Sequence, residues 1–159
     1  MYYYSTCILA FLLFILSSCS GEEGNQSQEE AAANDGNVQV IELRSVGDQM
    51  QFDKDEIRVS PNQTVRIVLI NEATMDAMKH NVLIVNEGTV NEVGQAAMSE
   101  VDNDYVPESP DVLFASALAE PGETVEIEFT PPGPGTYEFV CTFPGHYSMM
   151  RGTFIVEEE

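Results

Sequence analysis

The stretch Cys141-Thr142-Phe143-Pro144-Gly145-His146-Tyr147-Ser148-Met149-Met150 places a thiol, an imidazole and two thioethers on one short segment. Pro-Gly pairs favour tight turns, so Pro144-Gly145 predicts a bend that brings Cys141 and His146 together. The chain has only one other histidine, His80, and it begins the apolar run Asn81-Val82-Leu83-Ile84-Val85. These side chains therefore form a candidate metal-binding set drawn from two distant parts of the chain.

The chemistry of this set favours copper. A trigonal site of two imidazoles and one thiolate, with a long axial thioether, is the blue-copper arrangement. Taken singly, His80 is more often a buried strand histidine, Cys141 an inert buried thiol and Met150 a packing residue. Together and at this spacing they predict a copper site.

At these residues the chain resembles the azurin and auracyanin branch of the cupredoxins. The likeness lies in Cys-Thr-Phe-Pro-Gly-His with Met150 four residues beyond, and in Met78-Lys79-His80-Asn81 upstream. It extends through Pro121-Gly122-Glu123 and Pro134-Gly135-Thr136-Tyr137 and covers roughly residues 38–157. The resemblance implies an all-β cupredoxin fold, a Greek-key β-sandwich with one short helix between middle strands. It also implies one type 1 copper per chain.

The resemblance assigns roles position by position. His80, Cys141 and His146 match the ligands of the trigonal plane, and Met150 matches the axial ligand, with Met149 one residue out of register. The remaining matches are the backbone carbonyl of Lys79 as a weak axial contact, Asn81 as a tie between the ligand loops, and the Phe143 amide as a donor to the Cys sulfur. Val82 replaces the aromatic residue of azurins, the azurin disulfide has no counterpart, and Tyr147 matches auracyanins, so we favour the auracyanin-like subgroup.

The pattern after residue 37 is one of short strands separated by Gly and Pro turns, typical of an all-β sandwich. The helical candidate is Val90–Met98, which is apolar at Val90, Val93, Ala97 and Met98, and acidic residues 99–111 read as a loop. The expected strands are Val38–Val46, Glu56–Val59, Thr64–Ile70, His80–Val85, Glu123–Phe129, Gly135–Cys141 and Thr153–Val156.

The first residues read as an export leader. Residues 7–16 are apolar but too short to span a bilayer, and Leu16-Ser17-Ser18-Cys19 resembles a bacterial lipobox. We expect a lipoprotein signal peptide over 1–18, a lipidated Cys19 with an acidic tether over 19–37, and the copper domain over 38–159. The segment before the apolar core has no Lys or Arg, which departs from the lipobox pattern, and the alternative is an ordinary cleaved signal. The expected location is the periplasmic or extracellular face of a bacterial membrane.

The charge limits the partners. A formal net charge of −21 with only six Lys and Arg excludes nucleic acid, because phosphate contacts need cations. Such acidity steers basic partners, although it can also be only a solvated surface. The resemblance implies a monomeric domain and a redox partner such as a cytochrome c or a respiratory or photosynthetic complex. Residues Pro144, His146, Tyr147 and Met149, with Met75, Met78 and Phe114, are candidates for an apolar docking patch; ordinary packing is the alternative for all but Pro144 and His146.

The function expected from these observations is one-electron transfer by a membrane-tethered blue copper protein. The alternative is a copper-binding or homeostasis protein without electron transfer, and a metal-free adhesion domain is a weaker one. We expect no enzyme activity, because a nitrite reductase or multicopper oxidase needs further histidines and both of these are already assigned.

Overall fold

The computed structural model describes residues 37–159, and the expectations for the signal peptide, Cys19 and most of the tether lie outside them. Among the described residues, no helix is long and apolar enough to cross a membrane. The elements, in chain order, are β1 (Val38–Arg44), β2 (Glu56–Val59), β3 (Thr64–Ile70), β4 (Leu83–Asn86), α1 (Val90–Ala97), the 3-10 helix η1 (Val101–Asn103), β5 (Val112–Ala115), β6 (Thr124–Phe129), β7 (Gly135–Val140) and β8 (Arg151–Val156).

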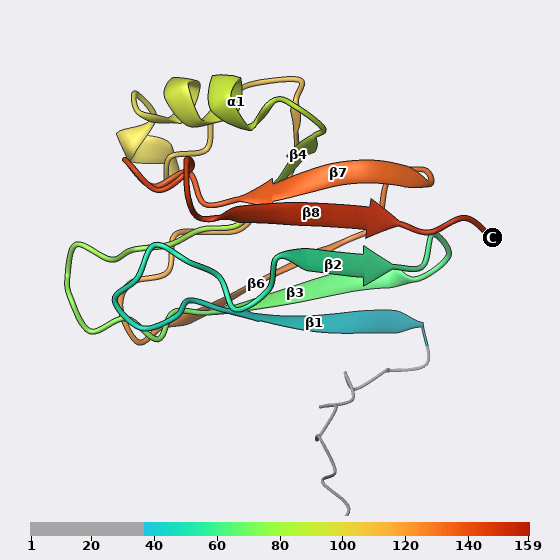
Figure 1. The fold of residues 1–159 in the computed structure, drawn as a ribbon, viewed down its shortest axis with the longest axis horizontal. Helices are drawn as coiled ribbons and strands as arrows, with labels where there is room; N and C mark the ends of the chain where they lie inside the picture. Colours follow the sequence, from blue (N-terminus) through green and yellow to red (C-terminus); the bar gives the residue numbers. More distant parts are fainter. Residues whose placement is uncertain (1–36) are drawn as a thin grey trace, which may run out of the picture. The chain divides into compact units, whose positions relative to one another are not determined.

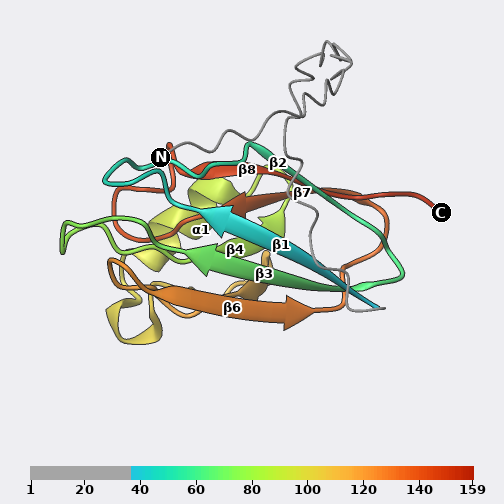
Figure 2. The same cartoon turned by 90° about the horizontal axis from the view of Figure 1, so that it is seen from below.

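The strands of residues 37–159 form two sheets that lie one over the other (Figure 1). The smaller sheet has the order β1-β3-β6, with β1 parallel and β6 antiparallel to β3 (Figure 2). The larger sheet has the order β2-β8-β7-β4-β5, in which β2 runs parallel to β8 and the other pairs are antiparallel. Neighbours in the sheets are therefore often distant in sequence, as expected for a Greek-key sandwich.

The core lies between the sheets because strand side chains alternate between two faces. In β3, Val65, Ile67 and Leu69 are fully buried and alternate with half-buried neighbours. β2 contributes Ile57 and Val59, and they join the same cluster as Phe139 and Phe154 of the larger sheet. Each fully buried side chain of this kind stabilises the fold by roughly 1.5–3 kcal/mol.

β4 departs from alternation because both of its faces are covered. Ile84 points into the main cluster, whereas Leu83 and Val85 form a second cluster with Val90 and Val93 of α1. The helix thus covers the outer face of the larger sheet near β4 (Figure 1). This explains the unbroken apolar run that follows His80.

The predicted all-β sandwich with a helix between middle strands is confirmed, but three local predictions are wrong. β4 begins at Leu83, and His80 instead forms an isolated bridge with Ala119 ahead of the strand. Met98 is 52 % exposed rather than on the buried helix face, because α1 ends at Ala97. The expected loop at 99–111 contains η1, and β5 was not predicted, because its half-buried residues make a short and weak pattern.

Candidate metal centre

The β7–β8 connection turns tightly to return Met150 beside Cys141. The amide of His146 donates to the Phe143 carbonyl at 3.0 Å, and Gly145 between them has φ +87°. Pro144 at the second position and a left-handed Gly145 at the third are the requirements of a type II turn. The Cys141 amide then donates to the Met150 carbonyl at 2.9 Å, which closes the loop at the ends of β7 and β8.

His80 reaches the same end of the domain from the β3–β4 connection. Both connections lie on the left of Figure 1. The His80 amide donates to the Ala119 carbonyl at 3.1 Å, and the Ala119 amide donates back at 2.8 Å. This exchange of two hydrogen bonds fixes the backbone that carries the imidazole.

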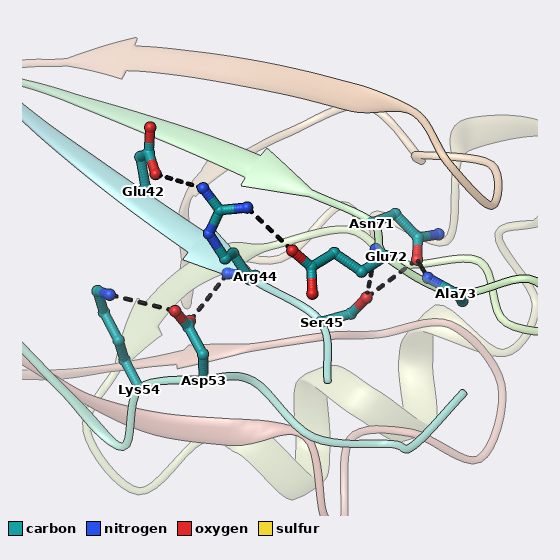
Figure 3. Close-up of polar contacts among 8 residues, drawn as sticks. All are labelled: Glu42, Arg44, Ser45, Asp53, Lys54, Asn71, Glu72 and Ala73. Carbon is teal, nitrogen blue, oxygen red and sulfur yellow. Dashed lines mark hydrogen bonds and ion pairs between the residues drawn. The ribbon is translucent and has the colours of Figure 1, made fainter. Parts of the chain in front are cut away.

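Asn71, which is 1 % exposed, anchors that backbone through its side chain. Its Nδ2 donates to the carbonyls of Met78 and Ala119 at 2.9 and 3.1 Å. Its Oδ1 accepts from the Ala73 amide at 3.0 Å and from the Ser45 hydroxyl at 3.1 Å (Figure 3). All four hydrogen-bonding positions of the amide are therefore used, and they join the segment that leads into His80 to Ala119 and Ser45.

Three potential ligand atoms meet where the two connections converge. Cys141 Sγ lies 3.8 Å from His80 Nδ1 and 3.7 Å from His146 Nδ1, and all three atoms lie within 4.8 Å of one another. The exposed fractions are 0 % for Cys141 and His80 and 4 % for His146. A sulfur and two imidazole nitrogens around one point, shielded from water, match the trigonal donor set of copper.

Burial sets the protonation of the three groups. It raises the pKa of the Cys141 thiol to about 12, against the opposing effect of hydrogen bonds from the Asn81 and Phe143 amides. Burial, and secondarily His146, lowers the pKa of His80 to about 4, and burial also lowers the pKa of His146. At neutral pH both imidazoles are uncharged and free to ligate, and a bound cation would convert the thiol to the thiolate. The residues present therefore fit the metal.

Asn81 and Thr142 tie the two connections together. The Thr142 amide donates to Asn81 Oδ1 at 2.8 Å, and Asn81 Nδ2 donates to Thr142 Oγ1 at 2.9 Å. The backbone amides of Asn81 and Phe143 both hydrogen-bond to the Cys141 sulfur. The position of the sulfur is thus fixed from both sides of the site.

The remaining candidate residues separate into buried and exposed groups. Met150 is fully buried in the cluster that contains Cys141, whereas Met149 is 64 % exposed. Lys79 precedes His80, and its ammonium pairs with Glu120 at 2.6 Å.

The members of the expected docking patch do not share one environment. Pro144 and Met75 are exposed, but His146 and Met78 are buried. Phe114 stacks on Phe129 with ring centroids 4.2 Å apart, so it belongs to the core, which was the alternative for it and for Met78. Tyr147 is half-buried and packs against Gly94 of α1, so part of its ring faces the helix.

Sequence reasoning missed three parts of the site: Asn71, the Asn81 backbone amide, and the residues Asp104 and Tyr105, whose carbonyls contact Asn81 and Thr142. Asn71 follows an apolar strand, where an Asn usually signals an exposed turn, so its burial had no sequence signal. Asp104 and Tyr105 lie in an acidic segment that reads as a solvated loop.

The comparisons with known proteins agree with this geometry. The family described as "Copper binding proteins, plastocyanin/azurin family" matches residues 39–157. The curated protein Auracyanin-A of Chloroflexus aurantiacus is 33 % identical over 153 residues, which cover 94 % of this chain and 93 % of that protein.

Two solved structures are similar as well. The "blue" copper protein auracyanin A of Chloroflexus aurantiacus has a TM-score of 0.70 at 36 % identity, covering 76 % of this chain and all of that one. The dithionite-reduced auracyanin of Roseiflexus castenholzii has a TM-score of 0.69 at 34 % identity, and the match covers 75 % of this chain and 97 % of that one.

These matches confirm the expected copper cofactor and the expectation that the protein is not an enzyme. The match spans nearly the whole described domain, and the cluster of His80, Cys141 and His146 lies within it. The chain therefore belongs to the plastocyanin/azurin family of copper-binding proteins, the cupredoxins.

Proposed function

We propose that the protein is a one-electron carrier in which His80, Cys141 and His146 hold a single type 1 copper. The observation that carries the proposal is the convergence of Sγ and two imidazole nitrogens of three buried residues within 4.8 Å. Bound copper supplies a Cu(II)/Cu(I) couple. Met150 is the proposed axial ligand, because it is buried in the same cluster as Cys141, and the Lys79 carbonyl is the proposed weak contact opposite.

The protein contributes a fixed and dry environment. Asn71, Asn81 and the type II turn hold the ligand-bearing backbones by hydrogen bonds that do not involve the metal. A site held in this way changes little between oxidation states, so the cost of rearrangement on electron transfer stays low. The Phe143 and Asn81 amides donate to the sulfur and adjust the potential by withdrawing charge from it.

The proposed electron exit is the small exposed edge of His146, 4 % of the residue, beside Pro144, Met149 and the outer part of Tyr147. Electron-transfer encounters are weak and use small interfaces. Five of the six Lys and Arg residues pair with carboxylates, so most carboxylates within residues 37–159 have no Lys or Arg partner; the five are Arg44, Lys54, Arg58, Arg66 and Lys79. The proposed partner is therefore a redox protein with a basic docking face, such as a cytochrome c.

Stopped-flow oxidation of the Cu(I) protein by a basic cytochrome c tests the carrier function. We expect fast one-electron transfer whose rate falls as salt rises from 20 to about 500 mM, because screening weakens steering. Met149→Glu should slow transfer without changing the visible spectrum, and Met98→Glu, at another exposed methionine directly after α1, is the matched control. Transfer no faster than copper release to a chelator would favour the alternative, a copper-homeostasis protein.

We also propose that Cys19 carries lipid and that residues 19–37 tether the domain to the periplasmic or extracellular face of a bacterial membrane. The support is the Leu16-Ser17-Ser18-Cys19 lipobox and the polar, acidic composition of the following residues. Expression in a bacterial host followed by detergent phase partition tests it. The wild-type protein should enter the detergent phase and Cys19→Ser the aqueous phase; equal partition of both would refute lipidation.

A further inference from the structure

Asp104 and Tyr105 have an unusual backbone. Their φ angles are +52° and +59°, and they are the non-glycine residues with positive φ among residues 37–159. The left-handed conformation costs an ordinary side chain roughly 1–2 kcal/mol, so two in succession persist only where the surroundings hold them.

The holding contacts come from the metal centre. Asn81 Nδ2 donates to the Asp104 carbonyl at 2.8 Å, and Thr142 Oγ1 donates to the Tyr105 carbonyl at 2.7 Å. These are the two side chains that tie the His80 and Cys141 connections together. The left-handed backbone presents consecutive carbonyls to both of them, which leaves their hydrogen bonds satisfied inside the protein. A third contact, from the Leu118 amide to Asp104 Oδ2 at 3.3 Å, fixes the pair from outside.

The side chain of Tyr105 reaches the ligand loop directly. Its ring meets the Phe143 ring edge-on, with centroids 5.1 Å apart and an interplanar angle of 79°. The Phe143 ring in turn contacts the His146 ring at 5.0 Å, and the Phe143 amide donates to the Cys141 sulfur. Edge-to-face aromatic pairs contribute roughly 0.5–1.5 kcal/mol beyond their buried area. Tyr105 therefore packs against the residue that contacts two of the proposed ligands.

We propose that Asp104 and Tyr105 act as a positioning brace for the copper loop, in which the backbone carbonyls fix the Asn81–Thr142 tie and the Tyr105 ring fixes Phe143. The inference rests on the proposed function, because its purpose is to hold ligands. The brace acts through other residues, because its hydrogen bonds and ring contact go to Asn81, Thr142 and Phe143, and it limits how far Phe143 and Thr142 can move.

The ring is tested with Tyr105→Ala and Tyr105→Phe in the full-length protein. The matched control is Tyr137→Ala, which removes another half-buried tyrosine, one on β7 that donates to the Gly133 carbonyl. Cu(II) affinity is measured by chelator competition, and hydrogen exchange of the Phe143 amide is measured by NMR in the metal-free protein. We expect Tyr105→Ala to bind Cu(II) about tenfold more weakly and to speed Phe143 exchange, as loss of outer-shell support does elsewhere.

Tyr105→Phe should restore both values, because the ring and not the hydroxyl forms the brace, and Tyr137→Ala should leave both unchanged. The proposal would be overturned if Tyr105→Ala showed the same Cu(II) affinity and the same Phe143 exchange rate as Tyr137→Ala. The exchange readout in metal-free protein separates this failure from that of the proposed function, which would show as a wild-type protein without a thiolate-to-copper band.

The backbone is tested independently with Asp104→Gly and Asp104→Val. Glycine adopts φ +52° without strain, whereas a β-branched residue is strongly disfavoured there. Both variants lose the Leu118 contact, so Asp104→Gly should bind Cu(II) more tightly than Asp104→Val, because only glycine keeps the left-handed backbone without strain. Asp104→Val should weaken Cu(II) binding about tenfold, as outer-shell changes do. Equal affinity of the two variants would overturn the role of the left-handed carbonyls.

Discussion

The ring of Tyr147 lies directly on the Cα of Gly94, so a methyl group at position 94 would overlap the ring carbons. Tyr147 follows His146 in the ligand loop, and Gly94 lies on the buried face of α1. The helix that covers the larger sheet thus also supports the loop that carries a proposed ligand. Glycine inside a helix is unfavourable by about 1 kcal/mol relative to alanine, and here it makes room for the tyrosine.

Gly94→Ala should therefore destabilise the protein despite the better helix propensity of alanine. Overpacking costs typically about 1–3 kcal/mol, which exceeds the propensity gain. Urea unfolding of the metal-free protein measures the change, with Gln95→Ala, at an exposed position of the same helix, as the control. An increase in the free energy of unfolding for Gly94→Ala would show that the Tyr147 contact does not constrain the loop.

Asn71→Ala should be among the more damaging substitutions outside the ligands. It leaves the carbonyls of Met78 and Ala119 without their donor, and buried unpaired groups cost about 1–3 kcal/mol each. We expect lower stability together with weaker copper binding, because the His80 backbone loses its anchor. Asn62→Ala, which removes an exposed amide bonded to Glu159, should change neither quantity. Unchanged copper affinity in Asn71→Ala would limit Asn71 to a role in stability.

The metal-free protein should lose stability as the pH falls. The pKa of His80 is about 4 in the folded protein against an ordinary 6.5, so between these values the unfolded chain binds a proton that the folded chain does not. The free energy of unfolding therefore decreases as the pH is lowered from 6.5 to about 4, and the contribution of His80 does not change further below that pH. The free energy of unfolding, measured by urea denaturation between pH 4 and 7, should change less with pH in His80→Asn than in the wild-type protein. Parallel pH dependence of the two proteins would contradict a neutral, buried His80.

Copper binding should release a proton. Because burial raises the pKa of Cys141 to about 12, the thiol is protonated in the metal-free protein at neutral pH, and ligation requires the thiolate. Calorimetric titration with Cu(II) at pH 7, in buffers of different ionisation enthalpy, should give about one proton released per copper. The release should disappear in Cys141→Ser. A wild-type value near zero would mean that Cys141 is already ionised or does not bind the metal.

The sequence predicts the parts of this protein that depend on local pattern. Thr64–Ile70 and Glu56–Val59 have the predicted bounds, because alternation and flanking turn residues define them. The Cys141–Met150 spacing identifies the metal centre because one tight turn must carry several ligands. His80 was identified because it is the other histidine and because Met78-Lys79-His80-Asn81 resembles the upstream ligand segment of azurins and auracyanins. The strand predicted to begin at His80 begins at Leu83.

The rest depends on contacts between distant segments. Asn71 and His80 are joined through Met78 and Ala119, and nothing local marks Asn71 as buried. Tyr147 beside His146 read equally well as a docking residue, and only the position of α1 shows that it packs on Gly94. The left-handed backbone at Asp104 and Tyr105 could not be predicted, because neither residue is a glycine and the conformation is imposed by tertiary contacts.

The visible spectrum of the purified protein, recorded after addition of Cu(II) and then of ascorbate, tests the redox copper site before any partner is known. We predict an intense thiolate-to-copper band that bleaches on reduction, returns on reoxidation, and is absent in Cys141→Ser. A colourless protein with one equivalent of copper bound and zinc excluded would contradict the assignment of Cys141 as a ligand, and with it the electron-carrier function.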